Sequence, residues 1–258
     1  MTGSSGMRDS GPMEPTGERT VPGIDREQYF FARHLAVYSW IRDAHLTAHA
    51  RVVDAGSGEG YGAALLRESG AEVVVGLEYD DGACRHAAST YRSVSMVRAN
   101  LADLPLRPRT IDLVVCLQVV EHLWDLPGFL SNVRAAVRPG GLLIASTPHR
   151  ETFSPGLGRG EKPLNPFHVE EFDAEQIRDL VMDAGWDDVD VLGLHHGDRI
   201  ATWESAHGSV MQAQVRAMVT DDWPTDLEAF IRSVTDDDFP IRACTQGAQD
   251  LIVIGRCP

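Results

Sequence analysis

The sequence predicts an α/β protein with a mostly parallel sheet covered by helices on both faces, and two observations lead to this prediction. Short apolar stretches alternate with segments of helical periodicity between residues 51 and 146. These stretches are rich in Val, Ile and Leu, as expected for strands that are buried on both faces. Repeated strand–helix–strand units favour parallel neighbours, so the alternation predicts one parallel sheet.

The elements of the first half follow in order. A helix with one apolar face is predicted over residues 24–45, where aromatic and apolar residues recur at helical spacing. Strands are predicted at 51–54, 72–77, 94–98, 111–117 and 142–146. Helices are predicted at 60–69, 81–91 and 126–137, the last one ending before Pro139-Gly140-Gly141.

In the second half, a long loop over 147–172 is rich in Gly and Pro, and loops of this length are usually functional or disordered. Asp173 is the predicted N-cap of a helix over 173–184. Strands are predicted at 186–194 and 251–257. The insertion between them, residues 195–250 with helices at 205–219 and 225–234, is expected to form a cap over the site or the contact of a homodimer.

Composition limits the function classes. Residues 1–23 are rich in Gly, Ser and Pro and are predicted to be a disordered tail, which leaves one domain over 24–258. A net charge of −15 argues against nucleic acid or an anionic membrane as partner. No apolar run approaches the roughly 20 residues of a membrane span, and the N-terminus has no apolar signal segment. The four cysteines show no CxxC spacing, which disfavours zinc or disulfide frameworks and favours a cytoplasmic protein.

The strongest motif is a glycine turn that directly follows the first strand, Val52-Val53-Asp54-Ala55-Gly56-Ser57-Gly58-Glu59-Gly60-Tyr61-Gly62. Glycines have no Cβ, so a ligand can approach the backbone closely at such a turn. In open α/β sheets, ligands bind at the carboxyl ends of the strands. The turn therefore predicts a nucleotide-type site at this edge.

Glu78 ends the second strand, at the spacing from the turn where an acidic residue can accept hydrogen bonds from ribose hydroxyls. A nicotinamide oxidoreductase is one alternative, because residues 58–63 satisfy a loose GxGxxA pattern. That pattern begins too late, however, since the first tight turn already occurs at Gly56. The alternative also predicts an all-parallel sheet of six strands.

Five motifs in order resemble the class I S-adenosylmethionine-dependent methyltransferases: the turn at residues 54–60, Glu78, Asn100-Leu101-Ala102-Asp103-Leu104-Pro105-Leu106, Leu117-Gln118-Val119-Val120-Glu121-His122-Leu123, and Arg138-Pro139-Gly140-Gly141. The resemblance covers about residues 29–258. It implies a Rossmann-like sheet of seven strands with a reversed last strand, and S-adenosylmethionine as cofactor.

The resemblance also assigns roles to matching positions. Asp54, Gly56 and Gly58 would hold the methionine part of the cofactor, Glu78 the ribose, and Tyr79 the adenine. Asn100 and Leu101 would lie near the adenine, although many relatives have an aspartate where this chain has Asn100. Gln118 would face the methionine end, and Glu121-His122 would begin a helix and support the site. His34 and Tyr38 resemble a leading-helix HLxxY feature that covers the cofactor, or simply pack the helix.

A hydroxyl acceptor needs a base, because a neutral alcohol is a weak nucleophile. Loops after the strands offer His149, His168 with Glu170, and His195-His196. An imidazole titrates near neutral pH, so His149 and His168 are the predicted bases, with Glu170 beside the second. Histidines and carboxylates at this edge also leave a Mg²⁺ or other divalent metal site open.

The runs Thr147–Gly156, Asn165–Phe172 and Ser233–Phe239 resemble an actinobacterial group of methyltransferases, in particular the sugar O-methyltransferase of methylmannose polysaccharide synthesis. This resemblance implies a carbohydrate acceptor methylated on a 1-hydroxyl. Trp faces and carboxylates suit sugar rings, and such residues of the insertion are Trp203, Trp223, Asp236, Asp237 and Asp238. Two alternatives stay open: a quinone- or polyketide-type hydroxyl as acceptor, and a cofactor-binding protein without catalysis.

Overall fold

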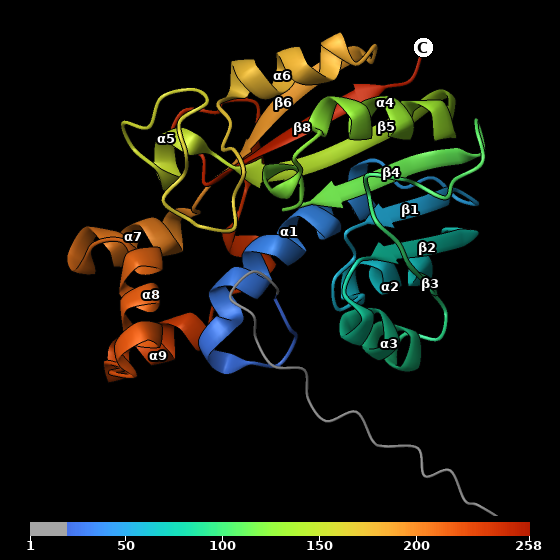
Figure 1. The fold of residues 1–258 in the computed structure, drawn as a ribbon. Coiled ribbons are helices and arrows are strands. Elements are labelled where there is room, and N and C mark those ends of the chain that lie inside the picture. Colours follow the sequence, from blue (N-terminus) through green and yellow to red (C-terminus); the bar gives the residue numbers. More distant parts are fainter. Residues whose placement is uncertain (1–19) are drawn as a thin grey trace, which may run out of the picture.

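The computed structural model describes residues 20–258 and contains one mixed sheet of eight strands in the order β3-β2-β1-β4-β5-β8-β6-β7 (Figure 1). The strands are β1 (Arg51–Ala55), β2 (Val73–Glu78), β3 (Ser95–Arg98), β4 (Ile111–Leu117), β5 (Val137–Pro148), β6 (Asp187–Leu194), β7 (Ile241–Arg242) and β8 (Asp250–Arg256). Strands β1 to β5 pair in parallel, whereas β8 runs antiparallel to both β5 and β6. The predicted α/β class and the reversed last strand are confirmed.

The predicted number of seven strands is wrong for the described residues. The additional strand, β7, has two residues and pairs antiparallel with the end of β6 at the edge of the sheet. So short a segment carries no periodicity in the sequence, which is why the pattern of apolar residues could not reveal it.

The helices are η1 (Asp25–Glu27), α1 (Gln28–Ala44), α2 (Tyr61–Glu68), α3 (Asp81–Thr90), η2 (Val120–His122), α4 (Leu126–Ala136), α5 (Arg150–Phe153), α6 (Ala174–Asp183), α7 (Asp198–His207), α8 (Val210–Thr220), α9 (Thr225–Arg232) and η3 (Asp236–Asp238). Figure 1 shows α4 and α6 on one face of the sheet and α1, α2 and α3 on the other. Successive strand residues point to opposite faces, so Val52 joins the core beneath α1 while Val53 joins the core beneath α4.

The helix boundary before β5 differs from the prediction for a local reason, whereas the start of α6 agrees with it. The helix predicted to reach Val137 ends at Ala136, and β5 begins at once, so that Pro139-Gly140-Gly141 lies in the first part of the strand. Asp173 caps α6 as predicted, with its side chain accepting from the amide of Gln176.

The insertion after β6 contains α7, α8 and α9 rather than the two predicted helices. The helix predicted over 205–219 is divided at Gly208, whose φ of 82° ends α7. Glycine adopts this conformation without steric cost, and Ser209 then caps α8 through the amide of Gln212. The three helices and η3 pack beside α1 (Figure 1).

Of the tail predicted over residues 1–23, residues 1–19 lie outside the described part of the chain. Thr20 is described, and its hydroxyl oxygen lies 2.7 Å from that of Tyr61. Among residues 20–258, no helix has both the length and the apolar character that crossing a membrane requires.

Candidate active site

The glycine turn after β1 has the tight geometry that the sequence predicts. Gly56 and Gly58 adopt φ values of 81° and 55°, which residues with a Cβ rarely adopt. A Cβ on Gly56 would also lie 2.4 Å from a methyl carbon of Val119. The turn therefore exposes backbone at the carboxyl end of β1 and tolerates no side chain at Gly56.

Asp54 is fully buried at the end of β1 and pairs with α1. The hydroxyl of Tyr38 donates toward both carboxylate oxygens of Asp54, at 3.1 and 3.0 Å. Burial raises the pKa of Asp54 to about 7, although the hydrogen bond from Tyr38 opposes this effect. The predicted HLxxY feature thus places Tyr38 directly against the predicted cofactor carboxylate.

Glu78 lies at the end of β2, beside the glycine turn. One carboxylate oxygen accepts from the amide of Gly58 at 2.9 Å and the other from the amide of Asp80 at 2.8 Å. These bonds fix the carboxylate of a side chain that is 8% exposed. Tyr79 beside it is 69% exposed, so its ring is accessible at the position predicted for the adenine.

Asn100 follows β3 and lies on the surface. Its side-chain oxygen accepts from the amide of Ala102 at 3.0 Å, which closes a local turn. The oxygen predicted to accept from the adenine thus already has one backbone donor. Leu101, by contrast, is buried and packs in the core beneath α4.

A polar network that the sequence did not predict lies under the carboxyl ends of β4 and β5. Gln118 donates to Asp250 and to the Ser146 hydroxyl, both at 3.2 Å, and its φ is 55°. Asp250 forms a buried, two-pronged ion pair with Arg33 of α1, with one bond of 2.6 Å. Burial alone would lower the pKa of Arg33, but the Asp250 carboxylate raises it.

His34 lies next to this network and hydrogen-bonds to the hydroxyl of Tyr61 through Nδ1. Burial lowers the pKa of His34 to about 4, so the ring is neutral at physiological pH. Its ring also packs edge-on against Tyr38.

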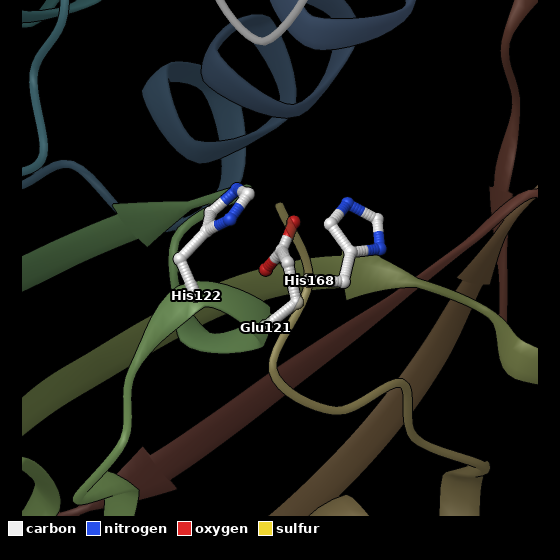
Figure 2. A group of neighbouring side chains, drawn as sticks. All are labelled: Glu121, His122 and His168. Carbon is white, nitrogen blue, oxygen red and sulfur yellow. The ribbon is translucent and has the colours of Figure 1, made fainter. Parts of the chain in front are cut away.

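Three side chains of types that can bind a metal ion or accept a proton lie close together at this edge: Glu121, His122 and His168. Their potential ligand atoms all lie within 4.8 Å of one another. Figure 2 shows the carboxylate of Glu121 between the two imidazole rings. Glu121 and His122 come from η2, whereas His168 comes from the long loop after β5. The predicted start of a helix at Glu121-His122 is a single 3₁₀ turn.

The other predicted bases lie elsewhere. His149 is 2% exposed at the end of β5, its Nε2 lies 3.7 Å from Glu151, and burial lowers its pKa. Glu170 accepts a hydrogen bond from Gln176 of α6. Neither belongs to the group in Figure 2.

Most of the insertion residues predicted to bind sugar have partners within the protein. Trp203 stacks on His207 and Phe230, with ring centroids 4.5 and 5.0 Å away. The ring of Trp223 lies under the guanidinium of Arg26. Asp236 accepts from Ser39 and Asp238 pairs with Arg199, while Asp237 is exposed. These contacts favour a structural role for the group.

Similarity to known proteins agrees with the fold and the glycine turn. Residues 53–145 match the family model described as "Methyltransferase domain". The chain is 42% identical to a "Probable S-adenosylmethionine-dependent methyltransferase" of Mycolicibacterium smegmatis, over 94% of this chain and 95% of that protein. It is 29% identical to a "Ubiquinone biosynthesis O-methyltransferase" of Methylobacterium, over 69% of this chain and 81% of that one.

The fold is also found in solved structures. A SAM-dependent methyltransferase of Thermotoga maritima, described as a possible histamine N-methyltransferase, superposes with a TM-score of 0.62 at 16% identity. The match covers 91% of this chain and 92% of that one. Together with the close mycobacterial relative, these matches show that the chain belongs to the S-adenosylmethionine-dependent methyltransferases.

Proposed function

We propose that the protein transfers the methyl group of S-adenosylmethionine to a hydroxyl group of a small cyclic acceptor. The group formed by Glu121, His122 and His168, at the same sheet edge as the glycine turn, is the observation that supports this proposal. A hydroxyl must lose its proton during methylation, whereas a neutral amine attacks without a base. These three side chains can accept that proton or stabilise the oxygen that loses it. They therefore favour oxygen over nitrogen as the acceptor atom.

The residues around the turn fit the cofactor. The buried carboxyl of Asp54 suits the cofactor's ammonium group. The tight turn at Gly56 and Gly58, whose positive φ values favour glycine, suits its methionine part. The carboxylate of Glu78, already fixed by two backbone amides, suits the ribose hydroxyls. We assign the exposed ring of Tyr79 to the adenine, with Asn100 and Leu101 at its edge, and Gln118, His34 and Tyr38 to the methionine end.

The chemistry is a substitution at carbon. S-adenosylmethionine supplies a methyl carbon on a positively charged sulfur that leaves as a neutral thioether. The protein's task is to hold the acceptor oxygen in line and to assist loss of its proton. We assign that assistance to the group containing His168. His149 and Glu170 remain weaker candidates, because they contact Glu151 and Gln176 and lie outside the group containing His168.

Two exposed aromatic side chains flank this group in the sequence. Trp124 follows His122 by two positions and is 90% exposed, and Phe167 precedes His168 and is 60% exposed. The backbone oxygen of Phe167 accepts from His122 Nδ1 at 2.9 Å, which joins the two segments. Flat aromatic surfaces suit a ring-shaped acceptor.

For the acceptor itself we propose a sugar, namely a partly methylated mannoside or oligomannoside methylated at its 1-hydroxyl. The resemblance of residues 147–156 and 165–172 to a sugar methyltransferase group supports this choice, and the mycobacterial relative is compatible with it. A quinone-type hydroxyl is the second candidate, because the Methylobacterium relative is named for ubiquinone biosynthesis. A homodimer through residues 195–250 remains a prediction.

Incubation with labelled S-adenosylmethionine and three acceptors tests the proposal: a partly methylated oligomannoside with a free 1-hydroxyl at its reducing end, a catechol and a primary amine. Methylation of the mannoside at oxygen is the expected result, and methylation of the catechol alone would transfer the assignment to the quinone-type candidate. Methylation of the amine alone would overturn the hydroxyl assignment. If S-adenosylhomocysteine binds but no acceptor reacts, a non-catalytic cofactor-binding role becomes the better interpretation.

A further inference from the structure

We propose that Glu121, His122 and His168 bind one divalent transition-metal ion, for which Zn²⁺ is the representative ion. Their ligand atoms lie within 4.8 Å of one another, a spacing that small side-chain adjustments convert into one coordination sphere. The proposal that the ion binds does not depend on which reaction the protein catalyses. Only the role of the ion in catalysis rests on the proposed hydroxyl methylation.

The backbone holds the two contributing segments together. The amides of Val169 and Glu170 both donate to the backbone oxygen of Glu121, at 2.7 and 3.3 Å. The rings of His122 and His168 lie 5.1 Å apart between centroids, at an interplanar angle of 74°. The site is thus preformed, although its two histidines, His122 and His168, are 46 residues apart in the sequence.

Both histidines are oriented in the way that metal-binding histidines usually are. Nδ1 of His122 donates to the backbone oxygen of Phe167 at 2.9 Å, and Nδ1 of His168 donates to the carboxylate of Glu171 at 2.8 Å. Such second partners fix the ring and assign the lone pair to Nε2, the atom that then faces the metal. A carboxylate behind a histidine also makes it a stronger ligand.

Charge also favours a cation here. Glu121 and Glu171 are 1% and 2% exposed. Two buried carboxylates beside the two imidazoles offset the charge of a divalent ion, which lowers the cost of burying that ion.

The ligand types select a class of ion. Imidazole nitrogen suits Zn²⁺, Co²⁺ and Fe²⁺, whereas Mg²⁺ prefers an all-oxygen shell. Two histidines and one carboxylate also leave positions open, as in catalytic rather than structural zinc sites. We therefore expect the site to bind Zn²⁺ or Co²⁺ and to discriminate against Mg²⁺.

One contact competes with the ion. The side-chain nitrogen of Asn165 lies 2.9 Å from Nε2 of His168 and donates to it. Coordination by this Nε2 displaces the hydrogen bond from Asn165, while the Asn165 oxygen keeps its bond from the amide of Phe167 at 3.0 Å. Asn165 therefore offers a variant that should strengthen metal binding instead of weakening it.

The catalytic consequence follows from the open positions. A hydroxyl oxygen bound there has a lowered pKa, so its proton passes to water and its oxygen keeps the electron pair that forms the bond to the methyl carbon. His168 is then a ligand, and the ion rather than the imidazole activates the acceptor.

The test uses the full chain without an affinity tag in a Cys244→Ser background, because that thiol is exposed. After treatment with a chelator, Zn²⁺, Co²⁺ and Mg²⁺ are titrated by calorimetry, and Co²⁺ is followed by its visible spectrum. We expect one equivalent of Zn²⁺ or Co²⁺, and at least tenfold weaker binding in His122→Gln and His168→Gln. Asn165→Asp should bind more tightly. His207→Gln is the matched control, since His207 Nδ1 also bonds a backbone oxygen, that of Trp203, at 2.9 Å.

Titration with S-adenosylhomocysteine shows whether each variant is folded. Metal binding that is unchanged in both His122→Gln and His168→Gln would overturn the site. So would metal binding that is weakened as much in His207→Gln as in those two variants. If the ion binds as described and the metal-free protein methylates a hydroxyl acceptor at full rate, the catalytic consequence is wrong and the site stands. If the ion binds but no hydroxyl acceptor reacts, the failure belongs to the proposed function.

Discussion

Burial raises the pKa of Asp54 from 3.8 to about 7, and this gives the residue two opposite pH effects. The folded chain holds a proton that the unfolded chain has lost between about pH 4 and 7, so this group's contribution to stability falls as pH rises through that window. The cofactor's ammonium needs the ionised form. Affinity for S-adenosylhomocysteine should therefore fall about tenfold per pH unit below about pH 7. Calorimetry across pH 5–8 measures this, and Asp54→Asn should bind weakly with a flatter profile.

Glu78→Ala should weaken binding of S-adenosylhomocysteine by roughly 1–3 kcal/mol, because the proposed ribose assignment gives this carboxylate charge-assisted hydrogen bonds to the ribose. The loss includes the amide bonds to Gly58 and Asp80 that shape the turn. Glu72→Ala, on an exposed carboxylate at the far end of β2, serves as control. If calorimetry gives the same affinity for S-adenosylhomocysteine in Glu78→Ala and Glu72→Ala, the assignment of Glu78 to the ribose is wrong.

Single residues of the site differ in how far the sequence predicted them. The positions of Asp54 and Glu78 were predictable because each lies at the end of a strand whose apolar pattern is local. The ion pair between Arg33 and Asp250 was not, since it joins residues 217 positions apart. The same holds for Glu121 and His168, whose proximity depends on the path of an irregular loop.

At the scale of elements, α1 and α2 meet where Gly62 faces Tyr38. A Cβ on Gly62 would lie 2.1 Å from the tyrosine ring, so Gly62→Ala should destabilise the protein by about 1–3 kcal/mol. The displaced ring should also lose its bond to Asp54 and change cofactor affinity. A double-mutant cycle with Tyr38→Ala checks the cause by chemical denaturation. If Gly62→Ala lowers the free energy of unfolding as much in the Tyr38→Ala background as in the parent protein, the clash with the tyrosine ring is not the cause.

Elements with strong local signals were predicted well, and those without them were not. The strand Ile111–Leu117 has the predicted bounds because five consecutive apolar residues, Leu113 to Leu117, form most of it. The first helix of the insertion, α7, was missed because its residues are mostly exposed and only Ile200 is buried. The four-residue α5 is too short to show helical periodicity.

At the scale of the whole molecule, the Arg33–Asp250 pair ties the first helix to the last strand. Asp250→Ala should cost about 3–5 kcal/mol in the free energy of unfolding, because it leaves the Arg33 charge buried without its carboxylate. The double variant Arg33→Met/Asp250→Leu should lose less of the free energy of unfolding, since neither charge remains. Urea denaturation of the two variants and the parent protein measures these losses. A smaller loss in Asp250→Ala than in the double variant would contradict this explanation.

The position of β8 between β5 and β6 has a consequence for how the molecule is assembled. During synthesis, every other strand is available before β8, yet β6 has no neighbour among β1 to β5 until residues 250–256 insert. A nascent chain therefore carries two open sheet edges facing one gap, which are prone to pairing with other chains. Arg33 receives its carboxylate, and Gln118 one of its partners, in that same step. The strand that joins β5 to β6 thus also completes the polar network around Asp250.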